Sequence, residues 1–202
     1  GRMCIFHDPT MKLWKHHHNE AQTRDIFMRR VEILLQLIRA NPRGTIVTGV
    51  GVELNELHKV LVARLPTYEV VLYTDNKRRI DELKHDPSTD WKTKVLVGKE
   101  SLYTGLDLPN RIGLVAVFRA LNYKPSIVEQ YTRDVLGLPN WEGVHYKRMV
   151  RQLQAAGRIQ RSKDDSGVIA LLSNTDQDVR DMLKHYPRAK LAASVDEVVF
   201  DA

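Results

Sequence analysis

The chain alternates short runs of consecutive apolar or β-branched residues with longer helix-like stretches, and this alternation constrains the fold more than any other feature. The short runs are residues 3–6, 45–48, 70–73, 95–97, 114–117 and 167–172. The helix-like stretches are residues 27–38, 54–65, 77–84 and 144–161, with another from residue 179. Strands that are apolar on consecutive residues are buried on both faces. We therefore predict an α/β fold with a mainly parallel sheet and helices on both faces.

Length and composition fit one domain of this kind. With 202 residues, of which 43% are hydrophobic, the chain can fill a single core. We divide it into a leading strand, linker and helix (1–44), a core that holds the sequence motifs (45–172), and a C-terminal helix and tail (173–202). Ligands of parallel sheets bind at the carboxyl ends of strands, so the loops of interest follow residues 48, 73, 97, 117 and 172.

Two absences in the sequence narrow the setting of the protein. Cys4 is the only cysteine, which excludes an internal disulfide and any all-cysteine zinc or iron–sulfur site within this chain. No apolar run is long enough to span a membrane, and the first residues lack the basic-then-apolar layout of a signal peptide. We therefore expect an intracellular protein, cytoplasmic or nuclear, that has no membrane partner.

A line of basic and amide side chains gives the strongest chemical signal. Its members, spaced by four, three, four and three residues, are Lys147, Arg151, Gln154, Arg158 and Arg161. This spacing predicts one shared helical face, which could be an ordinary solvated face. The alternative is a phosphate site, because a glutamine and two arginines can grip phosphate oxygens. Gly157 favours that alternative, since glycine inside a helix costs about 1 kcal/mol relative to alanine and suggests a close approach to the backbone.

The same segment resembles motif VI of superfamily 2 helicases, in the pattern Gln154-x-x-Gly157-Arg158-x-x-Arg161. A second segment, Gly105-Leu106-Asp107-Leu108-Pro109, resembles their motif V, and Asp165 and Gly167 follow motif VI at the spacing seen there. Over residues 45–172 the chain most resembles the second, C-terminal RecA-like motor domain of the XPD/DinG branch. The resemblance implies a RecA-like three-layer domain that belongs to an ATP-dependent DNA helicase or translocase.

The resemblance also implies roles for individual residues. Catalytic arginine fingers, which reach the phosphates of ATP across a cleft, would be Arg158 and Arg161. Contacts to the nucleotide would come from Gln154, Gly157, Asp107 and Gly105, and the last two would form the loop that couples the nucleotide to nucleic acid. Contacts to nucleic acid would come from Ser101, Thr104, Thr48, Lys147 and Arg151.

The sequence holds only half of such an ATPase. It has no Gly-x-x-x-x-Gly-Lys-Ser/Thr phosphate loop, since Gly98-Lys99 is followed by Glu100, and it has no acidic box to hold magnesium. ATP and Mg²⁺ would be bound mainly by a first RecA-like domain of the same polypeptide or complex. By resemblance, the substrate would be single-stranded or forked DNA rather than RNA, with 5′-to-3′ movement. We expect this chain alone to be inactive.

Two other functions stay open at this stage. One is a stand-alone nucleic-acid-binding module that keeps the shape without motor activity. The other is a nucleotide-cofactor enzyme built on the Gly49-x-Gly51 turn, with Asp75 or Glu69 as the carboxylate that binds the ribose. Lone Gly-x-Gly turns are common in α/β loops, and a cofactor site there would leave the arginine pair unexplained.

Two further patterns have a plain structural interpretation. The adjacent residues His16, His17 and His18 cannot all point the same way, so a polar linker is favoured over a metal site and no metal is predicted. Four aromatic residues alternate with basic ones, and packing is favoured over base stacking for them. These are Tyr123, Tyr131, Trp141 and Tyr146.

The net charge of +6 is concentrated in one part of the chain. Residues 111–163 contain ten Lys or Arg against three Asp or Glu, a local charge of +7. This excess lies between the segments that resemble motifs V and VI, where ATP and a nucleic-acid strand would both present phosphates.

Overall fold

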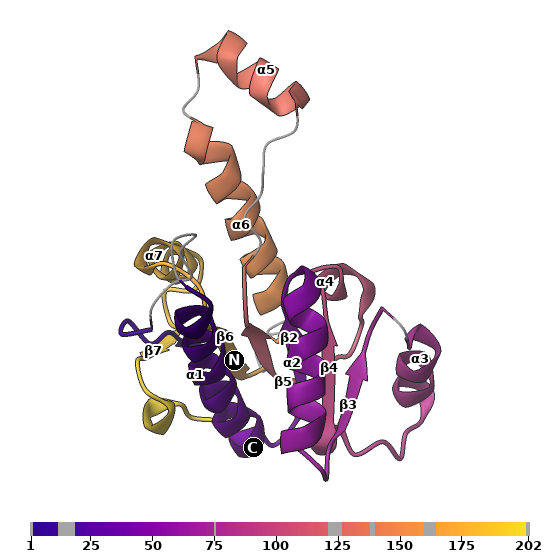
Figure 1. Ribbon diagram of the computed structural model, residues 1–202. Helices are drawn as coiled ribbons and strands as arrows, with labels where there is room; N and C mark the ends of the chain where they lie inside the picture. Colours follow the sequence, from indigo (N-terminus) through magenta and orange to yellow (C-terminus); the bar gives the residue numbers. More distant parts are fainter. Residues whose placement is uncertain are drawn as a thin grey trace.

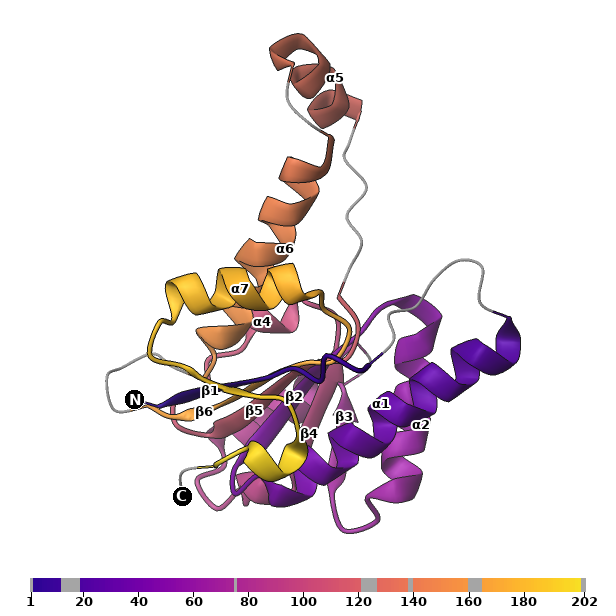
Figure 2. The same ribbon diagram turned by 90° about the vertical axis from the view of Figure 1, so that its left-hand side faces the viewer.

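A sheet of seven parallel strands forms the centre of the molecule (Figures 1 and 2). The computed structural model describes residues 2–11, 19–74, 76–120, 127–137, 140–159 and 165–200. The strands are β1 (Met3–Phe6), β2 (Gly44–Thr48), β3 (Glu69–Leu72), β4 (Lys94–Gly98), β5 (Ile112–Val117), β6 (Gly167–Leu171) and β7 (Lys190–Ala192). Their order is β3-β4-β2-β5-β6-β1-β7, and all neighbouring pairs are parallel. The predicted α/β class is confirmed.

Helices cover both faces of this sheet. One face carries α1 (Glu20–Ala40) and α2 (Gly51–Arg64). The other carries α3 (Lys77–His85), α4 (Leu102–Gly105), α6 (Asn140–Ala156) and α7 (Asp176–His185). Alternate strand residues feed the two cores: Val95 and Val97 of β4 pack on the α1/α2 side, and Leu96 packs on the opposite side. This explains why the strands are apolar on consecutive residues.

The strand order determines which helix lies on which face. From β1 to β3 the connections cross the sheet in one direction and use α1 and α2. From β3 to β7 they return in the other direction and use the remaining helices. Because parallel crossovers are right-handed, opposite directions require opposite faces. In this order the leading strand β1 lies between β6 and β7. The carboxyl ends of the neighbouring strands β4, β2, β5 and β6 lie side by side at one end of the sheet.

Local chemistry fixes several element ends. Helix α1 begins with a capping box between Asn19 and Gln22, and it ends at Ala40, shortly before Pro42. Helix α7 begins with a second capping box, in which Thr175 and Asp178 satisfy each other's backbone N–H groups. Two short 3₁₀ turns, Trp91–Thr93 and Val195–Glu197, complete the regular elements of the described residues.

The helix predicted at residues 144–161 is α6, which runs from Asn140 to Ala156 and ends there. Gly157 follows as a turn residue whose N–H donates to the Leu153 carbonyl at 2.9 Å. The inference from a glycine inside a helix is therefore wrong, because the helix has already ended. A methyl group at Gly157 would meet only carbonyl oxygens of Leu153 and Gln154, at 3.4 and 3.5 Å, which are ordinary contacts.

Helix α6 rises away from the sheet and leads up to α5 (Ile127–Leu136), so the two form a protrusion (Figures 1 and 2). Two of the four aromatic residues considered above lie on it, Tyr131 with 70% and Tyr146 with 62% of its surface exposed. The predicted packing role is wrong for these two rings. Tyr123 and the side chain of Trp141 lie outside the described part of the chain.

None of the helices in the described ranges combines the length and apolar character that crossing a membrane requires. His16, His17 and His18 lie outside the described residues. Within those residues, no group of three His, Cys, Asp or Glu side chains is placed to hold a metal ion.

Candidate functional site

Arg158 joins the two segments that resemble helicase motifs. It lies just after α6, and its Nη1 donates a hydrogen bond to the carbonyl oxygen of Leu106, which follows α4. Its Nε is buried and has no hydrogen-bond partner among the described residues. Partial burial lowers the pKa of the guanidinium, since desolvation disfavours the charged form. Segments 52 residues apart in sequence therefore meet at this one side chain.

The arginines on α6 and just after it differ in their partners. Within the described ranges, Arg148 and Arg151 approach carboxylates, whereas no carboxylate pairs with Arg158. A partly desolvated arginine without a carboxylate partner can bind an external anion well, because its remaining N–H groups donate charge-assisted hydrogen bonds to the oxyanion.

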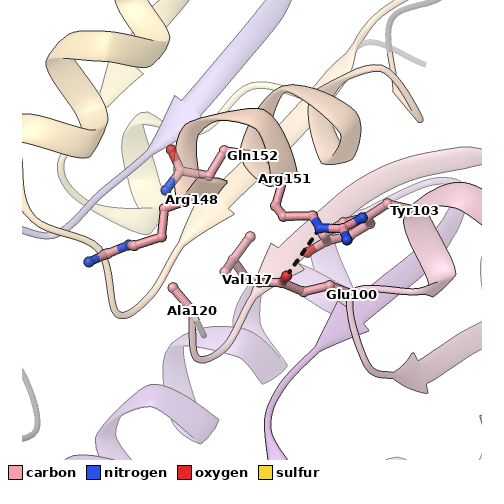
Figure 3. A pocket seen from close by; sticks show the side chains of 7 residues that line it. All are labelled: Glu100, Tyr103, Val117, Ala120, Arg148, Arg151 and Gln152. Atoms are coloured by element: carbon pink, nitrogen blue, oxygen red, sulfur yellow. Dashed lines mark ion pairs between the residues drawn. The ribbon is translucent and has the colours of Figure 1, made fainter. Parts of the chain in front are cut away.

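A polar chain links α6 to the loop after β4. Arg151 Nη1 donates to Gln154 Oε1 at 3.0 Å, and Arg151 Nε lies 3.8 Å from Glu100 Oε2 (Figure 3). Glu100 is 7% exposed, whereas 39% of the Arg151 side chain is exposed. The structure thus brings Arg151 and Gln154 together, as the sequence predicted for one helical face. Glu100 was missed, although its position directly after an apolar strand was a usable signal.

Thr48 departs from its predicted role. It ends β2 and is fully buried, and its hydroxyl shares a hydrogen bond with the hydroxyl of Tyr103 in α4. A buried hydroxyl that already has a partner cannot reach strand phosphates. The prediction of a nucleic-acid contact by Thr48 is therefore corrected. Its side chain connects the end of β2 to α4, and we no longer count Thr48 as part of the candidate interface.

The base of α6 is tied to α7 by a buried ion pair. Arg148 Nη2 lies 2.6 Å from Asp178 Oδ2, with 18% and 1% of the two side chains exposed. The Asp178 carboxylate also accepts from the N–H and hydroxyl of Thr175, at 2.8 and 3.0 Å. Beside this pair, the buried amides of Gln152 and Asn174 have no partner among the described residues. The pairing of Arg148 with Asp178 could not be predicted from the sequence, because the two residues are 30 positions apart.

A small cavity lies between these elements (Figure 3). Its lining residues are Glu100, Tyr103, Val117, Ala120, Arg148, Arg151 and Gln152. Its volume of about 10 Å³ is close to the space that one water molecule needs. Figure 3 shows that Glu100 and Arg151 face each other on one side of it, while Gln152 and Arg148 point to the other side.

The other predicted residues are distributed around this site. Ser101 is exposed directly before α4, and Asp107 is exposed between the buried Leu106 and Leu108. Lys147 is half-buried on α6. Thr104 and Gly105 are part of α4, but their side-chain environment lies outside the description, and Arg161 lies wholly outside the described residues.

The Gly49-x-Gly51 turn takes a form that argues against a cofactor site with Glu69. Val50 caps α2 without a side-chain hydrogen bond, and Gly51 has a φ of 51°, which glycine adopts without strain. Glu69 begins β3, so it lies at the amino ends of the parallel strands. The turn follows β2 and therefore lies at their carboxyl ends. Its carboxylate is also held by Arg79 at 2.5 Å and by Lys94 at 3.1 Å. The other candidate, Asp75, lies outside the described residues.

Comparison with solved structures places this fold among helicase domains. The chain is similar to an XPD helicase, with a TM-score of 0.63 and 13% identity over 95% of this chain and 36% of the other. It is also similar to the C-terminal domain of Saccharomyces cerevisiae Dbp5 bound to Gle1 and IP6, with a TM-score of 0.55, 12% identity, and coverage of 97% and 91%. Another C-terminal domain of the DEAD-box protein Dbp5 gives a TM-score of 0.53 at 15% identity, with coverage of 94% and 88%.

These likenesses define the RecA-like fold that the compared helicase structures share, and the predicted RecA-like fold is confirmed. The chain spans about a third of the length of the XPD helicase and most of the Dbp5 C-terminal domains. No family model and no curated protein sequence matches this sequence. The neighbours come from two helicase branches, so they define the fold and not the branch.

Proposed function

We propose that this domain is the C-terminal motor domain of an ATP-dependent helicase or translocase, acting on single-stranded or forked DNA. The observation that carries the proposal is the environment of Arg158. Its guanidinium is partly desolvated, lies against the loop that resembles motif V, and has no carboxylate partner among the described residues. A cation in this state gains most from an external oxyanion, such as a phosphate presented by a partner domain.

The residues present fit an ATP site that a second domain completes. Arg158 and Arg161 would contact the phosphates, while Gln154, Gly157, Gly105 and Asp107 would line the nucleotide side. ATP supplies the phosphoryl group whose transfer releases energy, and Mg²⁺ would be held mainly by the partner domain. This chain contributes positive charge where negative charge develops in the transition state.

The hydrogen bond from Arg158 to Leu106 suggests how the two events are coupled. When Arg158 turns to a phosphate oxygen, its hydrogen bond to the Leu106 carbonyl would be broken, so one of the contacts that position the loop holding Asp107 would change. The exposed Ser101 and Asp107 belong to this same stretch, and Arg151 of α6 approaches Glu100 at its start. Nucleotide contact would thereby change the grip on the strand.

The preference for DNA rests on the resemblance to the XPD/DinG branch, and the test therefore includes RNA. Ser101, Thr104, Lys147 and Arg151 would contact strand phosphates, and the exposed ring of Tyr146 on α6 is placed to stack on a base. Tyr146 takes a role here that the sequence pattern had left as the less favoured alternative.

A stand-alone nucleic-acid-binding module is the second candidate function. The observation that favours it is the lack of a phosphate loop anywhere in the sequence, which leaves this chain without the main ATP-binding element. In that case the chain binds single strands, but a first motor domain supplied with it gives no ATP turnover.

The decisive experiment substitutes Arg158→Ala in a protein that contains both motor domains. We expect kcat for ATP hydrolysis to fall by about 10³-fold, as for other arginine fingers, while nucleotide affinity changes only severalfold. Arg78→Ala is the matched control, because 94% of its side chain is exposed on α3, and it should retain full turnover. Equal losses of affinity and turnover in the Arg158 variant would argue for ground-state binding instead.

A further inference from the structure

A second hollow lies beside the edge strand β7 and its neighbour β1, and it shares none of its described lining with the site above. Its lining residues are Arg2, Met3, Cys4, Arg188, Lys190 and Val199. Its volume of about 320 Å³ falls in the range of small-molecule pockets and is far larger than the water-sized cavity near α6. This hollow is therefore large enough for a ligand.

The described charged residues that line the hollow are all cations. Besides burial, one nearby carboxylate, Glu197, contributes to raising the pKa of the Cys4 thiol. Three of its six lining residues are cations, and none of the described lining residues is a carboxylate. Arg188 is exposed and forms no ion pair with a described residue. Like charges gathered around one concave surface repel each other and raise the local positive potential, so an anion that enters gains from all three.

Two buried residues of β1 and one ordered cation also line the hollow. Met3 and Cys4 are 4% and 5% exposed, and they pack into the cores on opposite faces of the sheet. Lys190 lies beside Cys4 in the β1–β7 pair, and its Nζ donates to the Glu197 carbonyl at 3.0 Å, which orders the side chain. Burial raises the pKa of the Cys4 thiol, and the nearby positive charge of Lys190 partly opposes that rise.

We propose that this hollow binds an anion that carries two or more phosphoryl groups. Arginine matches phosphate oxygens with its planar fork, and lysine adds a point charge, so Arg188 and Lys190 supply the two forms of phosphate recognition that proteins use. The volume exceeds what one phosphate requires, which is why we assign a polyphosphate-type anion. The phosphoryl groups could belong to a small free anion or to a nucleic-acid backbone, and the test separates these sources.

The reactivity of Cys4, the only cysteine of the chain, can report ligand binding because Cys4 lines the hollow. We expect tripolyphosphate to slow the reaction of Cys4 with a thiol-specific reagent, and calorimetry to give a matching affinity. The variant Arg188→Gln with Lys190→Gln should weaken this binding at least about tenfold, since it removes two donors of charge-assisted hydrogen bonds. Because Lys190 influences the pKa of Cys4, protection is measured in each variant as the ratio of its own rates with and without ligand, and an unchanged urea unfolding midpoint shows that the fold is intact.

The matched control is Arg78→Gln with Lys92→Gln, which removes the same charge near the opposite edge of the sheet and should bind tripolyphosphate normally. Arg158→Ala should also bind normally, so this result is independent of the proposed motor function. A 5′-phosphorylated single-stranded oligonucleotide that also protects Cys4 identifies strand phosphates as the source. Protection by tripolyphosphate alone identifies a small free anion. The proposal is overturned if neither probe protects Cys4, or if both double variants lose binding equally.

Discussion

The arginines near the candidate site illustrate how residues of one type take different roles. Arg148 forms an ion pair with the buried Asp178. Arg158 instead donates a hydrogen bond to a backbone carbonyl, and its buried Nε has no partner among the described residues. A buried pair with additional hydrogen bonds holds elements together, and an arginine without a carboxylate remains available for an incoming anion. We therefore propose that Arg148 stabilises the folded state and that Arg158 serves the function of the protein.

This assignment predicts a difference in stability between two arginine substitutions. Arg148→Ala leaves Asp178 buried with only the Thr175 contacts, so the free energy of unfolding should fall by about 2–3 kcal/mol. Arg78→Ala removes only an exposed pair with Glu82, separated by four residues, and should cost less than about 0.5 kcal/mol. Urea denaturation measures both. Equal effects would show that the Arg148 pair is no more important than a surface contact.

At the scale of elements, one carboxylate adds ion pairs between the edge strand β3 and its neighbours. Glu69 contacts Arg79 of α3 and Lys94 of β4, so it links the helix, the edge strand and the next strand. These contacts lower the pKa of Glu69, chiefly through the hydrogen bond from Arg79. A carboxylate with a lowered pKa stabilises the fold above its unfolded pKa, and this stability is lost as the pH falls through its folded pKa.

Glu69→Gln should therefore reduce the free energy of unfolding at pH 7 by up to about 1 kcal/mol, and the difference from the wild type should shrink as the pH falls below about 4.5. Urea titrations at several pH values measure this dependence. A difference that stays constant down to acidic pH would mean that Glu69 contributes through packing and not through its charge.

At the scale of the whole molecule, the chain combines a complete RecA-like sheet with a sequence that has no phosphate loop. Of the basic residues in 111–163, Lys147, Arg148 and Arg151 lie on α6, which leads to Arg158. Positive charge is thus placed on the elements proposed to meet phosphates, while the proposed partner domain would supply most of the nucleotide site.

The purified chain is expected to show no ATP hydrolysis above background, with or without single-stranded DNA or RNA, because it lacks the loop that cradles the phosphates. A phosphate-release assay measures this, and a protein with both motor domains serves as the positive control. Robust turnover by the chain alone, stimulated by DNA, would contradict the assignment to the second half of a motor.

Most of the fold could be predicted from the sequence, because its signals are local. The alternation of apolar strands and amphipathic helices indicated a parallel sheet with two helical layers, and Asn41-Pro42 correctly marked the end of α1. Helix α5, the short β7 and α4, and the start of α6 were not predicted. Strand β7 and helix α4 are too short for periodicity to define them, and α5 was not separated from the segment that leads into α6.

The sequence alone determined the class of fold and the joint position of Arg151, Gln154 and Arg158 near one helix. Only the tertiary structure decided which of these side chains has a partner. Thr48 is buried against Tyr103, 55 residues away, and Arg148 is paired with Asp178, 30 residues away. Such partners depend on the order of strands across the sheet. Helical and strand periods describe one element at a time, and therefore carry no information about which element will lie beside it.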